Sequence, residues 1–302
     1  MRNIFFIVFV FIQLHTKAQE IFVVYSFKGD VTIVENKTEA KAKIGRILNA
    51  NTEIKVNNGA VVSLICNEVN LVTLKGPGKF SLSNYKNACA ANKESVTANY
   101  LKYVWTQLTT KKGAPEKNRK AYMSNTGAVS RSVNNIWIDP KLDTFNYVSG
   151  NFPLFWKSYA EAEDFQFQLY EKIKSKKPIY IFDTKNKFVT IKQIEKMMEP
   201  GKTYYWTAVV KDQENEERKI INVYKQDDYM RVLESLNKAE GGYENEAEKA
   251  FRMAFLLEDE HFLYEAYMHY QKAVKNRPDV SIYKTTLEAF KKDYGLIDTD
   301  VK

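Results

Sequence analysis

Few residues in this 302-residue chain could carry chemistry, and histidine is the scarcest of them. Two of the three histidines, His261 and His269, lie four residues on either side of Glu265. On a helix, residues four apart share a face, where imidazole and carboxylate groups can bind a metal ion. The two histidines themselves are turned about 80° from each other, so one ion cannot easily reach both. The pattern favours a solvated helix face, and we predict no metal site and no cofactor.

The sequence also lacks a convincing catalytic set. A Ser-His-Asp or Cys-His site would require His261 or His269 to meet a serine or cysteine from another part of the chain. Glu161 and Glu163 are typical of surface charge on a hairpin edge, with a two-carboxylate glycosidase site as the weaker alternative. We therefore expect a protein that is not an enzyme.

The first residues predict export. Met1-Arg2-Asn3 is a short positive start, Ile4–Ile12 is apolar, and Thr16-Lys17-Ala18 offers the small residues that signal peptidase requires. The apolar run would span about 14 Å as a helix, which is too short for a hydrocarbon core of roughly 30 Å. We expect a signal peptide over residues 1–18 and a periplasmic or cell-surface (extracellular) mature chain without a membrane span.

Export would place the two cysteines in a compartment where a disulfide can form. In an oxidising compartment Cys66 and Cys89 could form a disulfide, with two unpaired thiols as the alternative. Removing the signal peptide takes away Arg2 and Lys17 and lowers the formal net charge from +8 to +6. This mild surplus suits weak attraction to anionic polymers, and we expect no binding to nucleic acid.

Residues 19–85 are predicted to form a β-domain. Short apolar runs alternate there with turn residues such as Gly45 and Gly59. An ordered set of motifs resembles the FecR domain: Gly29-Asp30-Val31-Thr32, Ala42–Leu48, Thr52–Val62 and Leu74–Gly78. The resemblance implies a periplasmic signalling or binding module. Iron-responsive members follow a membrane span and an anti-sigma segment, which an export signal replaces here, so we do not expect this chain to act on a sigma factor.

Residues 86–150 are predicted to be a linker of helix and loop. An amphipathic helix over Glu94–Leu108 precedes a polar loop. The basic residues of this loop are Lys111, Lys112, Lys117, Arg119 and Lys120. We interpret the loop as a solvated linker, with contact to an anionic envelope polymer as the sharper alternative.

Residues 151–225 are predicted to form a second β-domain. Trp156, the segment Met198–Tyr204 and Trp206 together resemble the fibronectin type III sandwich. The resemblance implies that Trp156, Tyr204 and Trp206 lie in the core and that the tyrosine makes a corner hydrogen bond. Stacking of these rings on a ligand is the alternative. Domains of this type present and space other modules and are seldom enzymes.

The hydrophobic period becomes helical in residues 226–302. Helices are predicted over 228–239, 244–257, 261–276 and 281–294. The middle pair resembles one tetratricopeptide unit, with small residues at the helix crossing and Pro278 after the second helix. A single unit buries little, so we expect it to dock on the β-domains or on another chain. The residues predicted for partner docking are Ala254, Leu257, Ala266, Tyr270 and Ala273.

Together these patterns predict a multidomain fold, mainly β in the N-terminal and middle domains and α-helical at the C-terminus. The expected function is an exported, non-catalytic scaffold of the bacterial cell envelope that binds a protein partner through its helical region. One alternative is a protein that binds peptidoglycan or polysaccharide. The other is a regulatory subunit of an envelope signalling or protease system.

Overall fold

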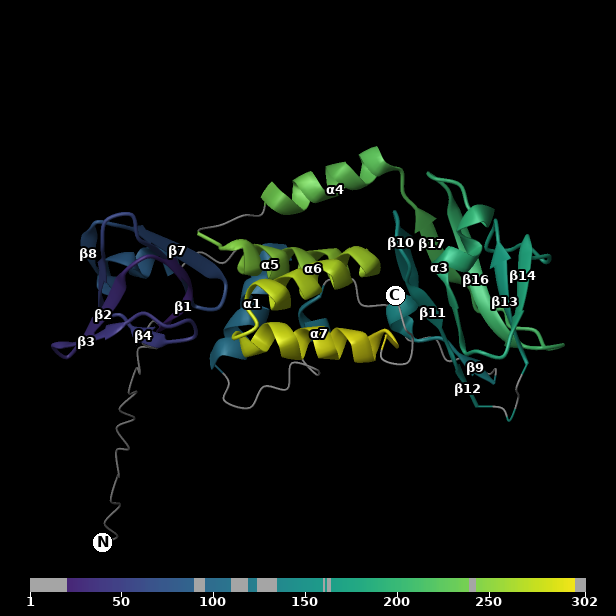
Figure 1. Cartoon of the computed structure of the whole chain (residues 1–302), viewed down its shortest axis with the longest axis horizontal. Coiled ribbons are helices and arrows are strands. Elements are labelled where there is room, and N and C mark those ends of the chain that lie inside the picture. Colours follow the sequence, from purple (N-terminus) through teal and green to yellow (C-terminus); the bar gives the residue numbers. More distant parts are fainter. Residues whose placement is uncertain are drawn as a thin grey trace, which may run out of the picture.

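The computed structural model describes residues 21–89, 96–109, 119–123, 135–159, 161, 164–238 and 243–296. Two β-rich regions lie at opposite ends of an elongated molecule, and helices occupy the space between them (Figure 1). The chain is therefore rich in strands in its N-terminal and middle parts and helical towards its C-terminus, which is the mixed layout that the sequence predicts. The predicted signal peptide, residues 1–18, lies outside the described residues. Within the described ranges, no helix is both long enough and apolar enough to cross a bilayer.

The first β-region, residues 21–89, consists of two four-stranded antiparallel sheets that share one core. One sheet has the order β4-β1-β6-β7, and the other has the order β3-β2-β5-β8. The strands are β1 (Ile21–Lys28), β2 (Val31–Glu35), β3 (Thr38–Lys41), β4 (Ile47–Asn49), β5 (Glu53–Val56), β6 (Val61–Cys66), β7 (Asn70–Lys75) and β8 (Gly78–Ser81). Phe22 and Leu64 of one sheet and Ile33 and Ile54 of the other lie in a single buried cluster. A 3₁₀ helix, η1 (Leu82–Cys89), closes the region.

Alternation of side chains explains why these segments form strands. In β5, Ile54 and Val56 are buried while Glu53 and Lys55 are partly exposed, which is the period of a strand with one face on the core. Gly29 joins β1 to β2 with φ of 76°, and a Cβ at this position would lie 2.9 Å from the Cβ of Ala60. Only glycine combines this backbone conformation with such a close approach.

The second β-region, residues 136–223, is built on a five-stranded sheet with the order β10-β17-β16-β13-β14. Its strands are β10 (Thr144–Tyr147), β13 (Phe165–Tyr170), β14 (Tyr180–Thr184), β16 (Thr203–Val210) and β17 (Lys219–Val223). β10 runs parallel to β17, and the other pairs are antiparallel. Two short ladders accompany the sheet: β11 (Pro153–Phe155) with β15 (Phe188–Thr190), and β9 (Ile136–Trp137) with β12 (Lys157–Ser158). The short helices here are η3 (Pro140–Leu142), α3 (Ile191–Ile194) and η4 (Glu195–Met197).

The predicted core aromatics of this region are buried. Trp156, Tyr204 and Trp206 are each at most 3% exposed, so none of the three rings is available to stack on a ligand. The hydroxyl of Tyr204 accepts a hydrogen bond of 3.0 Å from the backbone N–H of Glu199, five residues upstream. This bond fixes the turn that leads into β16, as a tyrosine corner does.

The helical hub lies between the two β-regions (Figure 1). We define it as α1 (Val96–Thr109), η2 (Arg119–Tyr122), α5 (Glu246–Asp259), α6 (Leu263–Asn276) and α7 (Ser281–Asp293). α4 (Gln226–Lys238) connects the second β-region to the hub, and its Tyr229 packs on Phe262 with ring centroids 5.1 Å apart. α4 to α7 lie within a few residues of the predicted helices.

The prediction that residues 86–150 form a linker needs correction in the part that the structure describes. Its helix α1 packs into the hub, where Tyr103 stacks on Phe255 with ring centroids 5.3 Å apart. Its last part contributes β10 to the five-stranded sheet. The amphipathic period was readable, but the apolar face of α1 is covered by α5, about 150 residues away in sequence.

Candidate functional site

The middle helix of the hub, α5, is buried on almost every side. All but two of its residues are buried, including the charged Glu248, Arg252 and Glu258. A buried charge is costly unless it is paired and hydrogen-bonded. The partners of these three residues therefore show how the hub is held to its surroundings.

Glu258 lies at the centre of a buried ionic cluster. Arg119 of η2 donates to both carboxylate oxygens of Glu258, at 2.8 and 3.0 Å, and also to Asp293 of α7 at 2.6 Å. Tyr270 and Tyr294 donate hydrogen bonds to the same carboxylate. Burial would raise the pKa of Glu258, but Arg119 and Lys120 outweigh it and lower this pKa to about 2. The cluster joins η2, α5, α6 and α7 into one body.

This cluster corrects the predicted polymer contact. Arg119 is 0% exposed, and Lys120 lies 3.0 Å from Glu258 with its amino group over the ring of Tyr294. Neither side chain can serve as a surface contact for a polymer while these pairs are intact. The other three residues of that prediction, Lys111, Lys112 and Lys117, lie outside the described residues.

The prediction of the partner-docking residues also needs correction. Ala254 and Leu257 of α5 and Ala266, Tyr270 and Ala273 of α6 are all 0% exposed. They hold α5 and α6 together and fill the hub, so they present nothing to another protein. Of the two docking possibilities left open by the sequence, these helices dock within their own chain.

The hub is joined to the first β-region by buried polar contacts. Tyr25 of β1 donates to Glu244 at 2.8 Å, and Glu244 in turn accepts two bonds from Arg252 of α5. The neighbouring Ser26 donates to Glu248, which also closes the capping box at the start of α5. Burial raises the pKa of Glu248. Two adjacent residues of β1 thus donate hydrogen bonds to two carboxylates at one end of the hub.

A different junction joins the hub to the second β-region. Asn146 of β10 donates from its backbone to the carbonyl of His261 at 3.0 Å and from its side chain to the carbonyl of Glu260 at 2.7 Å. Asn222 of β17 donates to the side chain of Asn146 at 2.9 Å and fixes its orientation. The edge strand β10 is therefore covered by the turn between α5 and α6.

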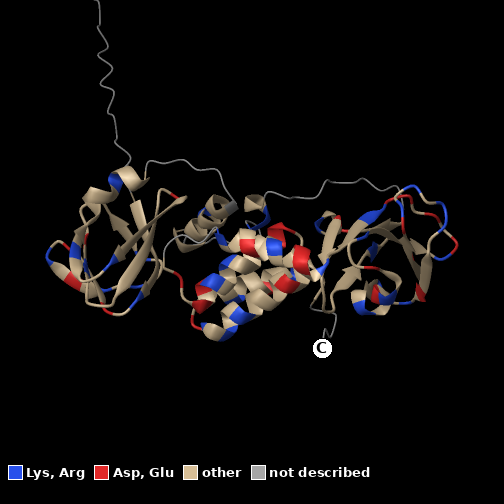
Figure 2. Ribbon diagram, turned by 90° about the horizontal axis from the view of Figure 1, so that it is seen from above, with Lys and Arg blue, Asp and Glu red and all other residues tan. Residues whose placement is uncertain are grey.

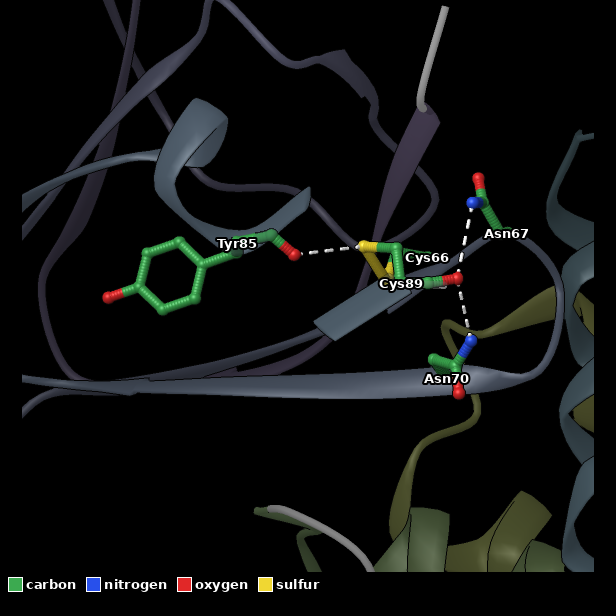
Figure 3. Close-up of a disulfide and its surroundings, with 5 residues drawn as sticks. All are labelled: Cys66, Asn67, Asn70, Tyr85 and Cys89. Carbon is green, nitrogen blue, oxygen red and sulfur yellow. Dashed lines mark hydrogen bonds between the residues drawn. A yellow bond between two sulfur atoms is a disulfide. The ribbon is translucent and has the colours of Figure 1, made fainter. Parts of the chain in front are cut away.

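The two cysteines form a disulfide, with sulfurs 2.22 Å apart (Figure 3). The bridge ties the end of η1 to the end of β6. The carbonyl of Cys89 accepts hydrogen bonds from the side chains of Asn67 at 3.3 Å, in the turn before β7, and of Asn70 at 3.0 Å, the first residue of β7. The bridge and these bonds fasten the last segment of the first β-region to its sheet.

The histidines do not form a site in the described part of the chain. His261 lies in the turn before α6 with φ of 60°, and no group of three potential metal ligands is found among the described residues. Glu265 and His269 of α6 are partly exposed as residues, but both carboxylate oxygens of Glu265 and Nδ1 of His269 are buried. Burial raises the pKa of Glu265 to about 7, although the backbone N–H of Ser149 partly opposes this shift. His261, through its carbonyl, and Glu265 lie where the hub packs against the second β-region.

A concave surface at the free end of the second β-region is the candidate binding site. We call it the tip cavity; its volume is about 650 Å³. Its floor is formed by Gln168, Tyr170 and Ile181 of β13 and β14, and its two walls come from the loops 171–178 and 211–218. The second loop is held over the sheet because Asn215 donates to the carbonyl of Ala208 at 3.1 Å.

The two walls of the tip cavity carry opposite charge. Lys174 and Lys176 line one wall, and Glu214 and Glu216 line the other. Arg218 lies with its guanidinium 3.6 Å from the ring centroid of Tyr170, which closes that ring to a ligand. In the ribbon of Figure 2, positions of Lys or Arg and of Asp or Glu alternate along the loops at this end of the molecule. The cavity can offer hydrogen bonds and ion pairs.

Sequence reasoning missed this cavity. The charged segment over Asp212–Arg218 folds over the sheet, and nothing in its own residues indicates this path. The available signal was the run of lysines over 172–177, which has no apolar period and precedes a strand.

No protein-family model matches this chain, and no curated protein matches it. The geometry of the described residues is therefore what supports a function.

Proposed function

We propose that this protein is an exported, non-catalytic scaffold of the bacterial cell envelope that binds a protein partner. One observation carries the proposal: the helical hub is joined to a β-region at each end through buried, specific polar contacts. Tyr25 and Ser26 make these contacts at one end, and Asn146 makes them at the other. Such contacts suit a molecule that holds two binding modules at a set separation.

Local features support the finer assignment of each part. The shared core of two small sheets supports a FecR-like first β-region. The corner hydrogen bond of Tyr204 and the burial of Trp156 support a fibronectin type III-like second β-region. Fully buried small residues at the α5–α6 crossing, Ala254 and Ala266, support a tetratricopeptide-like pair.

The partner surface that we propose lies on the β-regions. The hub residues expected to dock a partner are buried within the chain, while both β-regions reach the ends of the molecule (Figure 1). In this proposal the helical region positions the β-regions, and the β-regions make the contacts.

Site-specific photo-crosslinking in the producing cell tests this function. A photo-reactive residue is placed at exposed Lys79 of β8, at Ile181 of β14 and at Met268 of the hub. We expect protein adducts in the envelope fraction from at least one β-region position and none from Met268. Adducts at Met268 alone, or a chain retained in the cytoplasm, would contradict the proposal.

Binding to peptidoglycan or another polysaccharide is the second candidate. It is favoured by the exposed lysines of the loop 171–178, since exposed charge attracts anionic polymers. Co-sedimentation of the mature chain with envelope polymer, abolished by salt, would support it because such contacts are screened.

A further inference from the structure

We propose that the protein partner inserts an extended, acidic segment beside β14 as an added strand of the five-stranded sheet. This inference rests on the proposed scaffold function and names its contact surface. It is carried by three features of the strand: its open edge, its exposed isoleucines, and the lysines that flank it at both ends.

The two edges of this sheet are treated differently. β10, at one edge, is covered by the α5–α6 turn through the hydrogen bonds of Asn146. β14, at the other edge, pairs with β13 on one side, and no described strand pairs with its other side. An uncovered edge offers a row of backbone donors and acceptors to another chain. Addition of a strand to such an edge is a common mode of peptide recognition.

β14 carries little of the usual protection of an edge strand, because Asp183 is its single charged residue. The edge strand β3 of the first β-region carries Glu39 and Lys41, and charge at an edge discourages pairing. Ile181 of β14 is 49% exposed, and the residue two positions before it, Ile179, is equally exposed. Both are β-branched residues that fit a pleated surface, so the strand is suited to a partner rather than to solvent.

Lysines stand at both ends of β14. Lys176 and Lys177 precede it, Lys185 and Lys187 follow it, and all four are exposed. None of the four forms an ion pair with another described residue. Asp183 is the single acidic residue of the strand itself. An added strand with acidic residues at its ends would therefore meet complementary charge at each end.

The same charges disfavour pairing with a second copy of this chain. A two-fold antiparallel pairing centred on Ile181 would place Lys177 of each copy directly opposite Lys185 of the other. Like charges directly opposite each other on neighbouring strands are destabilising. The charge pattern thus selects an acidic partner over self-association.

The tip cavity adds a place for a side chain. Ile181 forms part of its floor, and Lys174 and Lys176 form its nearer wall. A residue of the added strand on the same face as Ile181 would lie at the rim of this cavity. An acidic side chain there would face the lysines, whereas the wall formed by Glu214 and Glu216 lies across the cavity.

The probe for this inference is a synthetic peptide of alternating valine and threonine with two glutamates at each end. Its binding to the full mature chain is measured by fluorescence anisotropy. A matched peptide carries lysines in place of the glutamates, and another carries prolines in place of the threonines. We expect the acidic peptide to bind, the lysine peptide not to bind, and the proline peptide to lose binding because it lacks backbone donors.

Variants locate the contact. We expect Ile181→Lys to abolish peptide binding and the triple change Lys174→Glu, Lys176→Glu and Lys177→Glu to weaken it about tenfold. Lys79→Glu, an exposed change on the first β-region, is the control and should leave binding unchanged. Hydrogen exchange of the backbone amides over residues 179–184 should slow when the acidic peptide binds.

Several outcomes would overturn the inference. They are equal binding of the proline peptide, unchanged exchange over residues 179–184, complete displacement by an anionic polysaccharide, or no binding of the acidic peptide. If the peptide fails while crosslinking at Lys79 still captures a protein, only this surface is wrong. If no β-region position crosslinks to a protein, the scaffold function itself fails.

Discussion

Two basic segments look alike in the sequence, but a cation of one is buried in the structure while the lysines of the other are exposed. The segment 117–120 and the segment 172–177 are both short, polar and rich in positive charge. In the first, Arg119 is fully buried against Glu258 and Asp293. In the second, Lys172, Lys174, Lys176 and Lys177 are all exposed. The difference lies in the partner carboxylate: Glu258 is 139 residues from Arg119 in sequence and is brought to it by the packing of the hub.

The comparison teaches that a run of cations does not by itself indicate a surface. Burial of a cation is favourable only where a carboxylate and further hydrogen bonds replace water. α5 supplies the carboxylate at η2, whereas the lysines of the loop 171–178 form no ion pair with a residue that the structure describes. The same residue types therefore hold the hub together at one place and remain free to attract a partner at the other.

The largest expected effect comes from breaking the buried pair. Arg119→Met leaves Glu258 buried without its main counter-charge, and we expect a loss of about 3–5 kcal/mol in the free energy of unfolding. Urea denaturation followed by tryptophan fluorescence measures it. Arg119→Lys is the matched control and should lose less, because it keeps the charge. Wild-type stability in Arg119→Met would show that the cluster contributes nothing.

The stability contributed by Glu258 is also expected to depend on pH. The pKa of Glu258 in the folded chain, about 2, is below its ordinary value of 4.5, so its contribution is present above pH 4.5 and is lost as pH falls towards 2. This loss should be present in the wild type and reduced in Arg119→Met. Parallel pH profiles of unfolding for the two proteins would contradict it.

The stability contributed by the disulfide can be compared with that contributed by the buried Arg119–Glu258 ion pair. Cys66 and Cys89 are 23 residues apart, and the double change Cys66→Ser with Cys89→Ser should cost about 3 kcal/mol because the unfolded chain gains freedom. Thermal unfolding with and without reductant measures it, and reductant should affect the wild type only. A reductant effect in the double variant would mean that another bond is involved.

Glu265 is a largely buried carboxylate whose pKa shift is caused mainly by burial. Its pKa in the folded chain is raised to about 7, so the protein loses stability as pH rises from about 4.5 to 7. Glu265→Gln should remove this loss and stabilise the protein at pH 8 by on the order of 2–3 kcal/mol. The two proteins should be closely similar at pH 4.5. A destabilised variant at pH 8 would show that the ionised carboxylate is favourable where it lies.

The smallest effect is expected at the exposed lysines. Lys174→Glu combined with Lys176→Glu should change the free energy of unfolding by less than about 0.5 kcal/mol, because neither side chain has an ion-pair partner among the described residues. Urea denaturation provides the comparison with Arg119→Met. A loss as large as that of the buried pair would remove the distinction between the two segments.

Much of the local structure could be predicted from residue spacing. The helices α4 to α7 begin and end within a few residues of their predicted bounds, since the apolar spacing that predicts them is a local property. The burial of Trp156, Tyr204 and Trp206 followed from a resemblance over a short motif. By contrast, the tip cavity depends on where the loop 211–218 folds after its strand ends, and no local pattern encodes that path.

Residue types and their spacing were enough to predict the helices α4 to α7, the scarcity of histidine, and the one possible cysteine pairing. These properties depend on neighbouring residues or on composition. Only the tertiary structure decided that α1 belongs to the hub, that Ala254 and Tyr270 are internal, and that Arg119 is buried while Lys176 is not. Each of these depends on which distant surface covers a side chain, because burial is a property of two segments in contact and periodicity is a property of one.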